Sequence, residues 1–138
     1  MKIFYKTSAT ATGGRSGRAA LDDDSFAVQM VPPGTGAQGV NPEQLFALGY
    51  AACFDSAMSL VAKQMGVDAP QARSSVQVGI GQRDGGGYAL DLDITAHLPG
   101  MDPAQAQKLV EATHAVCPYS NATRGNIDIR LHIDTDEA

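Results

Sequence analysis

The segment from Asn41 to Gly66 constrains this chain most, because it has the pattern of one long helix that is apolar on nearly every side. Asn41 suits the N-cap, Pro42 suits the first helical position, and Glu43 places a negative charge in the first turn. Lys63 in the last turn and Gly66 beyond it mark the end. A helix that is apolar around most of its circumference is a buried one. The rest of the chain is therefore predicted to wrap around it.

The length of 138 residues predicts one domain, residues 1–138. A helix of roughly 25 residues spans roughly 37 Å, which exceeds the diameter of a compact domain of this size. Such a helix cannot be covered on all sides by so short a chain alone. A second copy of the chain is therefore expected, as a homodimer.

Charge and cysteine content narrow the class of protein. The net charge is -5 and no basic run occurs, which argues against nucleic acid as a partner. The first residues lack the apolar core of a signal peptide, and we expect no apolar run of membrane-spanning length. These features predict a cytoplasmic protein without a membrane partner. In that compartment two cysteines are more often reduced, catalytic or redox-active than joined as a structural disulfide.

The residues before the long helix predict a meander of short strands. Residues 2–10 alternate weakly, and residues 17–21 and 26–30 form two further short strands joined by turns rich in glycine and aspartate. Residues 32–39 hold two prolines and three glycines and are expected to form a loop. The N-terminal third is thus predicted to be an antiparallel sheet.

The residues after the long helix predict a second sheet and a second helix. Residues 76–80 and 88–94 alternate strictly and are joined by the turn at 84–87, the pattern of a hairpin. A helix is expected from 103 to 116, and residues 126–133 alternate as a closing strand. The predicted fold is α+β, with antiparallel sheets of about six strands wrapped around a long buried central helix, plus a second helix.

The two cysteines are the first candidates for chemistry. Cys53 lies in the middle of the long helix, and Cys117 lies at the end of the second helix. Free cysteine often behaves as a small core hydrophobe, and pairing cannot be deduced from spacing. The residues alone leave both interpretations open.

Two charged residues could favour a reactive thiol. Arg18 lies on a short predicted strand beside glycines, and Glu43 lies at the head of the long helix. Each is ordinarily a solvated surface residue. An arginine near sulfur, however, favours the nucleophilic thiolate, and a carboxylate can hold the guanidinium in a two-point grip. Arg18 and Glu43 are therefore candidate partners of Cys53.

The helix geometry limits how Glu43 could act. Glu43 precedes Cys53 by about ten residues, so in a straight helix the two would stand roughly 15 Å apart. Either the helix bends sharply, or the carboxylate comes from a partner subunit. Small residues lie near the midpoint of that interval, namely Ala47, Gly49, Ala51 and Ala52. They would let two such helices cross closely about a two-fold axis, and this crossing is expected to form the dimer.

The three histidines give only weak support for a metal site. His114 and Cys117 have ligand-like spacing and Cys53 could join them, but His97 and His132 lie in strand patterns without a nearby partner. A complete site needs three or four ligands, often in short-spaced pairs. No metal is therefore predicted.

Four separated runs of this sequence together resemble one family, the organic hydroperoxide resistance proteins, which form the Ohr branch of the Ohr/OsmC superfamily. The resemblance covers nearly the whole chain, and the last run favours the Ohr branch over its OsmC siblings. In chain order the runs are Ala11–Ala19, Asn41–Ala47, Gly49–Phe54 and Cys117–Asn126.

The resemblance implies an intertwined homodimer with active sites at the interface, and a cysteine-based peroxidase without metal, haem or other cofactor. Cys53 matches the cysteine that attacks the peroxide and Cys117 the resolving cysteine. Arg18 and Glu43 match the charged pair that activates the site. The implied substrates are organic, including lipid-derived, hydroperoxides, and the implied reductant is a dithiol, a dihydrolipoyl group on a lipoylated protein.

An apolar entrance would favour a bulky organic peroxide over a small polar one. Phe46, Tyr50, Phe54 and Met58 are candidates to line it, although plain core packing explains each equally well. Two other classes of function remain: a peroxide-responsive redox regulator, and a non-catalytic binder of small apolar molecules that uses the same pocket.

Overall fold

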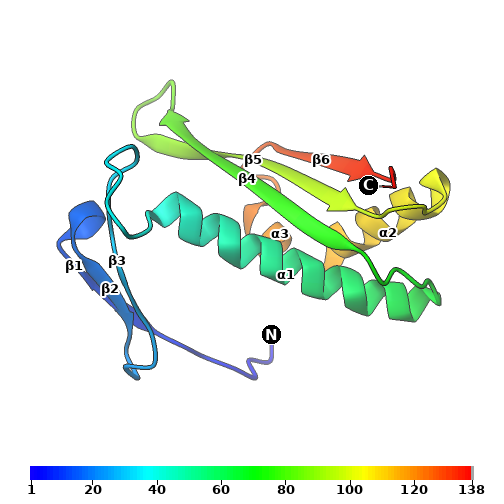
Figure 1. Cartoon of the computed structure of the whole chain (residues 1–138), viewed down its shortest axis with the longest axis horizontal. Coiled ribbons are helices and arrows are strands. Elements are labelled where there is room, and N and C mark those ends of the chain that lie inside the picture. The colour runs from blue at the N-terminus through cyan, green and yellow to red at the C-terminus, as the bar shows by residue number, and fades with distance from the viewer. Residues whose placement is uncertain (138) are drawn as a thin grey trace. The chain divides into compact units, whose positions relative to one another are not determined.

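The computed structural model describes residues 1–137 and has the predicted α+β class, with two three-stranded sheets and three α-helices in that range. The chain forms two compact units (Figure 1). The first is Met1–Leu45 and the second begins at Phe46, within the long helix. The single domain expected from the chain length stays a prediction.

The first unit is the predicted antiparallel meander. Strands β1 (Ala9–Thr12), β2 (Arg18–Leu21) and β3 (Ala27–Gln29) lie in that order, with β2 in the middle. A short 3-10 turn at Gly14–Ser16 joins β1 to β2. The turn follows Gly13, whose φ of 81° lies in the left-handed region that glycine reaches without strain.

The opening strand is much shorter than predicted. Residues 2–10 were expected to form it, but β1 begins only at Ala9. The pairing starts at Ala9 opposite Leu21, the last residue of β2, so the residues before Ala9 run past the end of their neighbour. Alternation shows that a segment can form a strand, but a strand also needs a partner for its backbone groups.

The long helix, α1 (Pro42–Met65), begins and ends where its capping residues predict. The backbone N–H of Gln44 donates to Asn41 Oδ1 at 2.8 Å, and the N–H of Asn41 donates to Gln44 Oε1 at 2.9 Å. This reciprocal pair satisfies two of the free N–H groups at the helix start. At the other end Gly66 has φ 70° and donates to the Lys63 carbonyl, as in a glycine cap.

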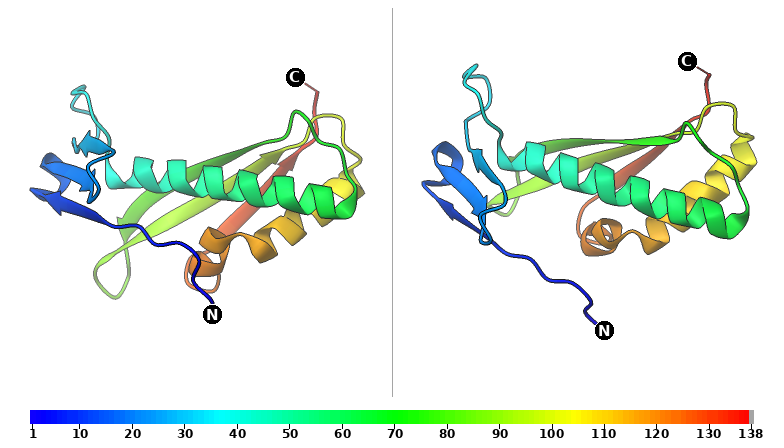
Figure 2. Two further views of the ribbon diagram at one scale, coloured as in Figure 1. Left: turned by 90° about the horizontal axis from the view of Figure 1, so that it is seen from below. Right: turned by 60° about the horizontal axis from the view of Figure 1, so that its bottom comes forward.

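The second unit holds the remaining elements. Strands β4 (Arg73–Gln82), β5 (Tyr88–His97) and β6 (Ile129–Asp134) form one sheet with β5 in the middle. Helices α2 (Pro103–Val116) and α3 (Pro118–Thr123) lie between β5 and β6 in the chain. Figure 2 shows α1 and α2 on the same side of this sheet.

The core of the second unit lies between the sheet and these helices. Alternate β5 side chains point into it and meet apolar residues of α1 and α2. The largest fully buried side chains of this cluster are Tyr50, Phe54, Met58, Leu92, Ile94, Leu98, Leu109 and Val110. Burial of α1 is one-sided, however, since Leu48 is 64% and Leu60 55% exposed. The rest of the chain therefore covers only one side of this helix, as expected of a chain too short to enclose it.

Helix α1 is long and apolar enough to cross a membrane by length and composition alone, with a mean hydropathy of 1.5 over its best window. The expectation that no apolar run reaches such a length is wrong by this criterion. The core helix of a soluble protein passes the same test, and Tyr50, Phe54 and Val61 of α1 do belong to the core of the second unit.

The second sheet is mixed rather than antiparallel. β4 and β5 form the predicted hairpin, but β6 pairs with β5 in parallel, from Leu92 opposite Ile129 to His97 opposite Asp134. The chain from β5 to β6 passes through two helices, and such a crossover returns the strand in the same direction. The second of these, α3, was not predicted, because Pro118 was interpreted only as the end of α2.

The outer face of this sheet carries a charged cluster at the β5–β6 pair. Arg130 donates to both carboxylate oxygens of Asp91 at 2.9 and 2.7 Å, and to both of Asp93 at 2.9 and 2.6 Å. His132 Nε2 lies 2.8 Å from Asp93. These hydrogen bonds hold the pKa of both carboxyl groups below the usual range, that of Asp93 furthest.

We expect Arg130→Gln to raise the pKa of Asp91 and Asp93 and to lower the urea midpoint of unfolding at neutral pH. A carboxyl with a depressed folded-state pKa stabilises the fold above its unfolded pKa, and this contribution is lost as the pH falls through the folded value. The difference between variant and parent should therefore shrink below about pH 4. Carboxyl ¹³C titration and urea melts at fixed protein concentration measure both effects. Arg83→Gln, on the β4–β5 hairpin, is the control and should change neither pKa.

Candidate functional site

The structure brings the two cysteines together. Cys53, in the middle of α1, and Cys117, between α2 and α3, both lie in the second unit. The Cys117 thiol donates to Cys53 Sγ across 3.8 Å, and both thiols are free. A disulfide needs about 2.05 Å between the sulfurs. A small movement of either side chain would therefore suffice to join them.

The position of Cys117 follows from the residue after it. Pro118 disfavours helical backbone at the preceding residue, so Cys117 takes an extended conformation, φ −64° and ψ 124°. It ends α2, with its N–H bonded to the Thr113 carbonyl at 2.9 Å, and its own carbonyl accepts from Asn121 in α3 at 2.9 Å. The thiol is thus held at a fixed corner between two helices, and Cys117 is 0% exposed.

Cys53 is the accessible member of the pair, because it is only partly buried. Burial raises the pKa of the Cys53 thiol, and the neighbouring Cys117 raises it further. A hydrogen bond from the Tyr119 backbone N–H acts the other way on this pKa. Within the second unit burial outweighs that bond, so a reactive thiolate at Cys53 needs a further positive charge.

The predicted ion pair exists, but with a different arginine. Glu43 is bound by Arg15 through two hydrogen bonds, Nη1 to Oε2 at 2.7 Å and Nη2 to Oε1 at 2.6 Å. This contact lowers the pKa of the Glu43 carboxyl and raises that of Arg15. The prediction that Arg18 pairs with Glu43 is therefore wrong. Arg18 is in β2 opposite Thr12, and within residues 1–137 it has no ion pair.

The signal that could have found Arg15 is the glycine pair before it. Gly13 and Gly14 both have positive φ, and this turns the chain into the 3-10 turn that contains Arg15. A side chain on such a turn can extend away from its sheet, whereas Arg18 is fixed by its pairing with β1 and β3. The Arg15–Glu43 pair belongs to the first unit.

Aromatic rings gather beside the sulfurs in the second unit. The Tyr119 ring lies 5.5 Å from that of Tyr50 and 6.1 Å from that of Phe46, between centroids. Gly49 makes room for it, because a Cβ there would stand 2.7 Å from the Tyr119 hydroxyl. Gly49 thus has a role inside one chain, beside any role in a helix crossing. The partly exposed members of this cluster are Phe46 and Tyr119.

The other predicted pocket residues are core residues. Tyr50 and Phe54 are 0% exposed and Met58 is 1% exposed. All three belong to the hydrophobic core of the second unit. Tyr119, which the sequence reasoning missed, presents an exposed ring beside Phe46 instead.

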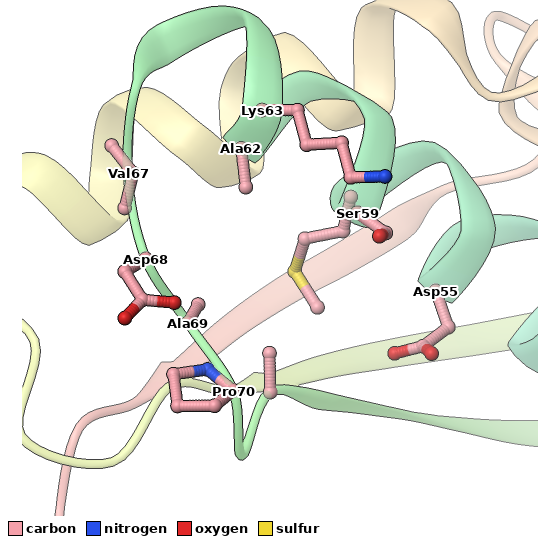
Figure 3. A pocket seen from close by; sticks show the side chains of 10 residues that line it. Asp55, Ser59, Ala62, Lys63, Val67, Asp68, Ala69 and Pro70 are labelled. Atoms are coloured by element: carbon pink, nitrogen blue, oxygen red, sulfur yellow. The ribbon is translucent and has the colours of Figure 1, made fainter.

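A separate pocket of about 340 Å³ lies along the second half of α1 and the segment after it (Figure 3). Its lining includes Asp55, Met58, Ser59, Lys63 and Asp68. Figure 3 shows the Lys63 and Asp55 side chains coming from α1, and Asp68 and Pro70 coming from the facing segment. Neither cysteine lines this pocket, so it is distinct from the thiol pair.

The histidines have other partners than a metal ion. His114 Nδ1 lies 2.8 Å from Ser120 Oγ, His97 bonds Ser75 and Asp134, and His132 bonds Asp93. Over residues 1–137 no group of three histidine, cysteine, aspartate or glutamate side chains is arranged to hold a metal.

Comparisons with known proteins agree with this architecture. The family model of OsmC-like proteins matches residues 34–132. An organic hydroperoxide resistance protein of Xanthomonas axonopodis pv. citri is 49% identical over 94% of both chains. The crystal structure of the organic hydroperoxide resistance protein OhrB of Bacillus subtilis has a TM-score of 0.88 at 38% identity, covering 94% of this chain and 98% of its own.

A further crystal structure is a putative organic hydroperoxide resistance protein from Vibrio cholerae, with captopril bound in one of its active sites. It has a TM-score of 0.91 at 42% identity and covers 97% of this chain and 94% of its own. Family model, sequence relatives and solved structures thus agree with each other and with the motifs. The chain belongs to the OsmC-like family and, within it, to the organic hydroperoxide resistance proteins.

Proposed function

We propose that this protein is a cysteine-based peroxidase that reduces organic hydroperoxides to alcohols. The observation that carries the proposal is the sulfur pair, one thiol partly exposed and one buried, 3.8 Å apart, in a family named for resistance to organic hydroperoxides. An accessible thiol beside a resolving thiol is the arrangement of a two-cysteine redox centre.

The first step breaks the O–O bond of the peroxide. The Cys53 thiolate attacks one peroxide oxygen, the sulfur is oxidised to sulfenic acid, and the other oxygen leaves as the alcohol after it takes up a proton. In the second step the Cys117 thiol condenses with the sulfenic acid. The S–S bond forms, the S–O bond breaks, and water leaves. A dithiol then returns both cysteines to thiols by exchange.

We propose that an Arg15–Glu43 pair, from this chain or from a second copy, supplies the charge that Cys53 lacks. Burial raises the pKa of this thiol, and a guanidinium close to the sulfur would lower it and donate hydrogen bonds to the peroxide oxygens. Glu43 holds the guanidinium by both oxygens and so fixes its plane. We assign to Arg15 the role that the sequence reasoning gave to Arg18.

The organic part of the substrate and the reductant follow from the surroundings of the sulfur. Phe46 and Tyr119 offer an aromatic surface beside Cys53, which suits an alkyl or lipid chain better than a small polar peroxide. We propose a dihydrolipoyl group on a lipoylated protein as the dithiol reductant. The dihydrolipoyl group has an apolar chain that carries two thiols. This chain could pack on the same aromatic surface of Phe46 and Tyr119.

We propose that the working form is a cytoplasmic homodimer. Helix α1 leaves Leu48 64% and Leu60 55% exposed. A long helix that is apolar on nearly every side is ordinarily buried, so these exposed side chains favour an interaction site along α1. A second copy would cover it and could bring an Arg15–Glu43 pair to the cysteines of its partner.

Steady-state consumption of cumene hydroperoxide with dihydrolipoamide tests the proposal. We expect multiple turnovers, slower reaction with hydrogen peroxide, and little support from thioredoxin as the reductant. Peroxide binding without turnover would support a non-catalytic binder instead. Oxidation that stops after one equivalent with every dithiol would support a redox regulator.

A further inference from the structure

A chain of buried hydrogen bonds next to the sulfurs has no part in the chemistry described above. The Tyr50 hydroxyl and Ser120 Oγ are 2.7 Å apart, and Ser120 Oγ lies 2.8 Å from His114 Nδ1. Tyr50 and Ser120 are both 0% exposed. This relay, Tyr50–Ser120–His114, lies wholly in the second unit and joins α1, α3 and α2.

The relay and the sulfur contact join the same two segments of the chain. Tyr50 precedes Cys53 by one helical turn of α1, and Ser120 follows Cys117 by the first turn of α3. The same two segments are thus tied twice, once through the sulfurs at 3.8 Å and once through the hydroxyls at 2.7 Å. A movement of the corner between α2 and α3 away from α1 would therefore disturb both contacts.

His114, the third member of the relay, joins α3 to α2, the helix that precedes Cys117. His114 lies in the last turn of α2, and burial together with the nearby Arg124 charge lowers its pKa, which favours the neutral ring. Arg124 also donates to the His114 carbonyl at 2.8 Å. Cys117 therefore lies between α2 and α3, and the hydrogen bond between His114 and Ser120 joins these two helices.

The three side chains of the relay have few other hydrogen-bond partners. Without Ser120 Oγ, the Tyr50 hydroxyl keeps only Thr123 Oγ1 at 3.4 Å. Every buried side-chain nitrogen and oxygen in residues 1–137 has a hydrogen-bond partner. Removal of Ser120 Oγ would take from His114 Nδ1 the bond at 2.8 Å and leave the Tyr50 hydroxyl with the longer one alone. Such networks fix one arrangement of the surrounding backbone.

We infer that Tyr50, Ser120 and His114 are positioning residues that hold the Cys117 thiol in line with the Cys53 sulfenic acid and thereby set the rate of disulfide formation. The inference rests on the proposed function. Two reactions compete for the sulfenic acid. Cys117 condenses with it to the disulfide and water, or a second hydroperoxide oxidises it to sulfinic acid and leaves as alcohol. The relay favours the first reaction because condensation needs the two sulfurs in contact.

The test is a single-turnover reaction of the reduced protein with excess cumene hydroperoxide, quenched and analysed by intact mass. For Ser120→Ala and Tyr50→Phe we expect loss of the Cys53 thiol at the parent rate, but a ratio of sulfinic acid to disulfide raised about tenfold. His114→Leu should raise the ratio likewise. His114→Asn should restore much of the parent value, because its side chain keeps a polar atom near the Nδ1 position.

Thr113→Val is the matched control. Thr113 is 0% exposed and its hydroxyl bonds the Leu109 carbonyl at 2.7 Å, so the variant loses a buried hydrogen bond of α2 outside the relay. Its ratio should stay at the parent value. An unchanged ratio in Ser120→Ala and Tyr50→Phe, or an equal rise in Thr113→Val, would overturn the inference.

Closure of the disulfide by diamide separates this inference from the proposed function, since diamide joins two thiols without a peroxide. If the parent protein fails to reduce cumene hydroperoxide, the proposed function fails, yet slower closure in Ser120→Ala than in Thr113→Val would still support a positioning role. If the parent reduces the peroxide and closure is equally fast in all variants, only the positioning role fails.

Discussion

Cys53→Ser is expected to lose organic hydroperoxide reduction by at least about a thousandfold, because a serine hydroxyl at neutral pH is neither ionised nor readily oxidised. Cys117→Ser should instead reduce a first equivalent of peroxide at the parent rate, and a second only slowly as its sulfenic acid overoxidises. Its Cys53 sulfenic acid has no thiol 3.8 Å away with which to condense. The measurement is peroxide consumed per protein, with and without dihydrolipoamide, together with the intact mass of the product.

Each cysteine variant serves as the control for the other, since each removes one sulfur of the same pair. Cys117→Ser should accumulate sulfinic acid when peroxide is in excess, whereas Cys53→Ser should remain unmodified. Turnover by Cys53→Ser at the parent rate would reject the assignment of the attacking cysteine. Sustained turnover by Cys117→Ser would show that the reductant meets the sulfenic acid directly.

Arg15→Met is expected to lower the rate of peroxide reduction about a hundredfold at neutral pH, since it removes the charge that stabilises thiolate and leaves Glu43 without its partner. The pKa of Cys53 should rise further above the ordinary thiol value. The deficit should shrink as the pH increases through that pKa, because thiolate then forms without a neighbouring cation. Thiol titration and single-turnover rates against pH measure both effects.

Arg18→Met is the matched control for Arg15→Met. It removes an equal charge three residues further along the chain, from a residue of β2 that is not paired with Glu43. Its rate and thiol pKa should stay near those of the parent. A large loss in Arg18→Met with a small one in Arg15→Met would restore the original assignment.

Mixed dimers show which subunit provides the arginine. Arg15→Met retains its Cys53, and Cys53→Ser retains its Arg15. If the pair acts across the dimer, mixing the two inactive variants should restore activity at one site of each heterodimer. No recovery after demonstrated subunit exchange would place the charge and the sulfur of each site in one chain.

The predictable parts of this fold are those that short stretches of sequence determine. The limits of α1 follow from Asn41 and Gly66, each of which satisfies backbone groups through bonds to residues within one turn. The β4–β5 hairpin follows from strict alternation around a glycine-rich turn. In both cases the groups that form hydrogen bonds are close in sequence, so the local sequence pattern is enough to predict the structure.

The unpredicted parts depend on residues that are distant in sequence. The direction of β6 depends on the path through α2 and α3, and alternation is the same for either direction. The arginine that binds Glu43 depends on where a 3-10 turn directs its side chain, whereas the motif contains two arginines with equal chemistry. Likewise, Ser120 and Tyr119 gain their roles only because α3 lies against α1.

The unequal exposure of the two sulfurs also determines how the oxidised protein can be repaired. Cys117 is fully shielded while Cys53 reaches the surface. An incoming thiolate must approach in line with the bond that it breaks, so it can meet only the Cys53 sulfur and must expel Cys117 as the leaving group. In the proposed cycle the mixed disulfide with the reductant is therefore expected on Cys53. The buried Cys117 thiol would be released first, while Cys53 is still joined to the reductant.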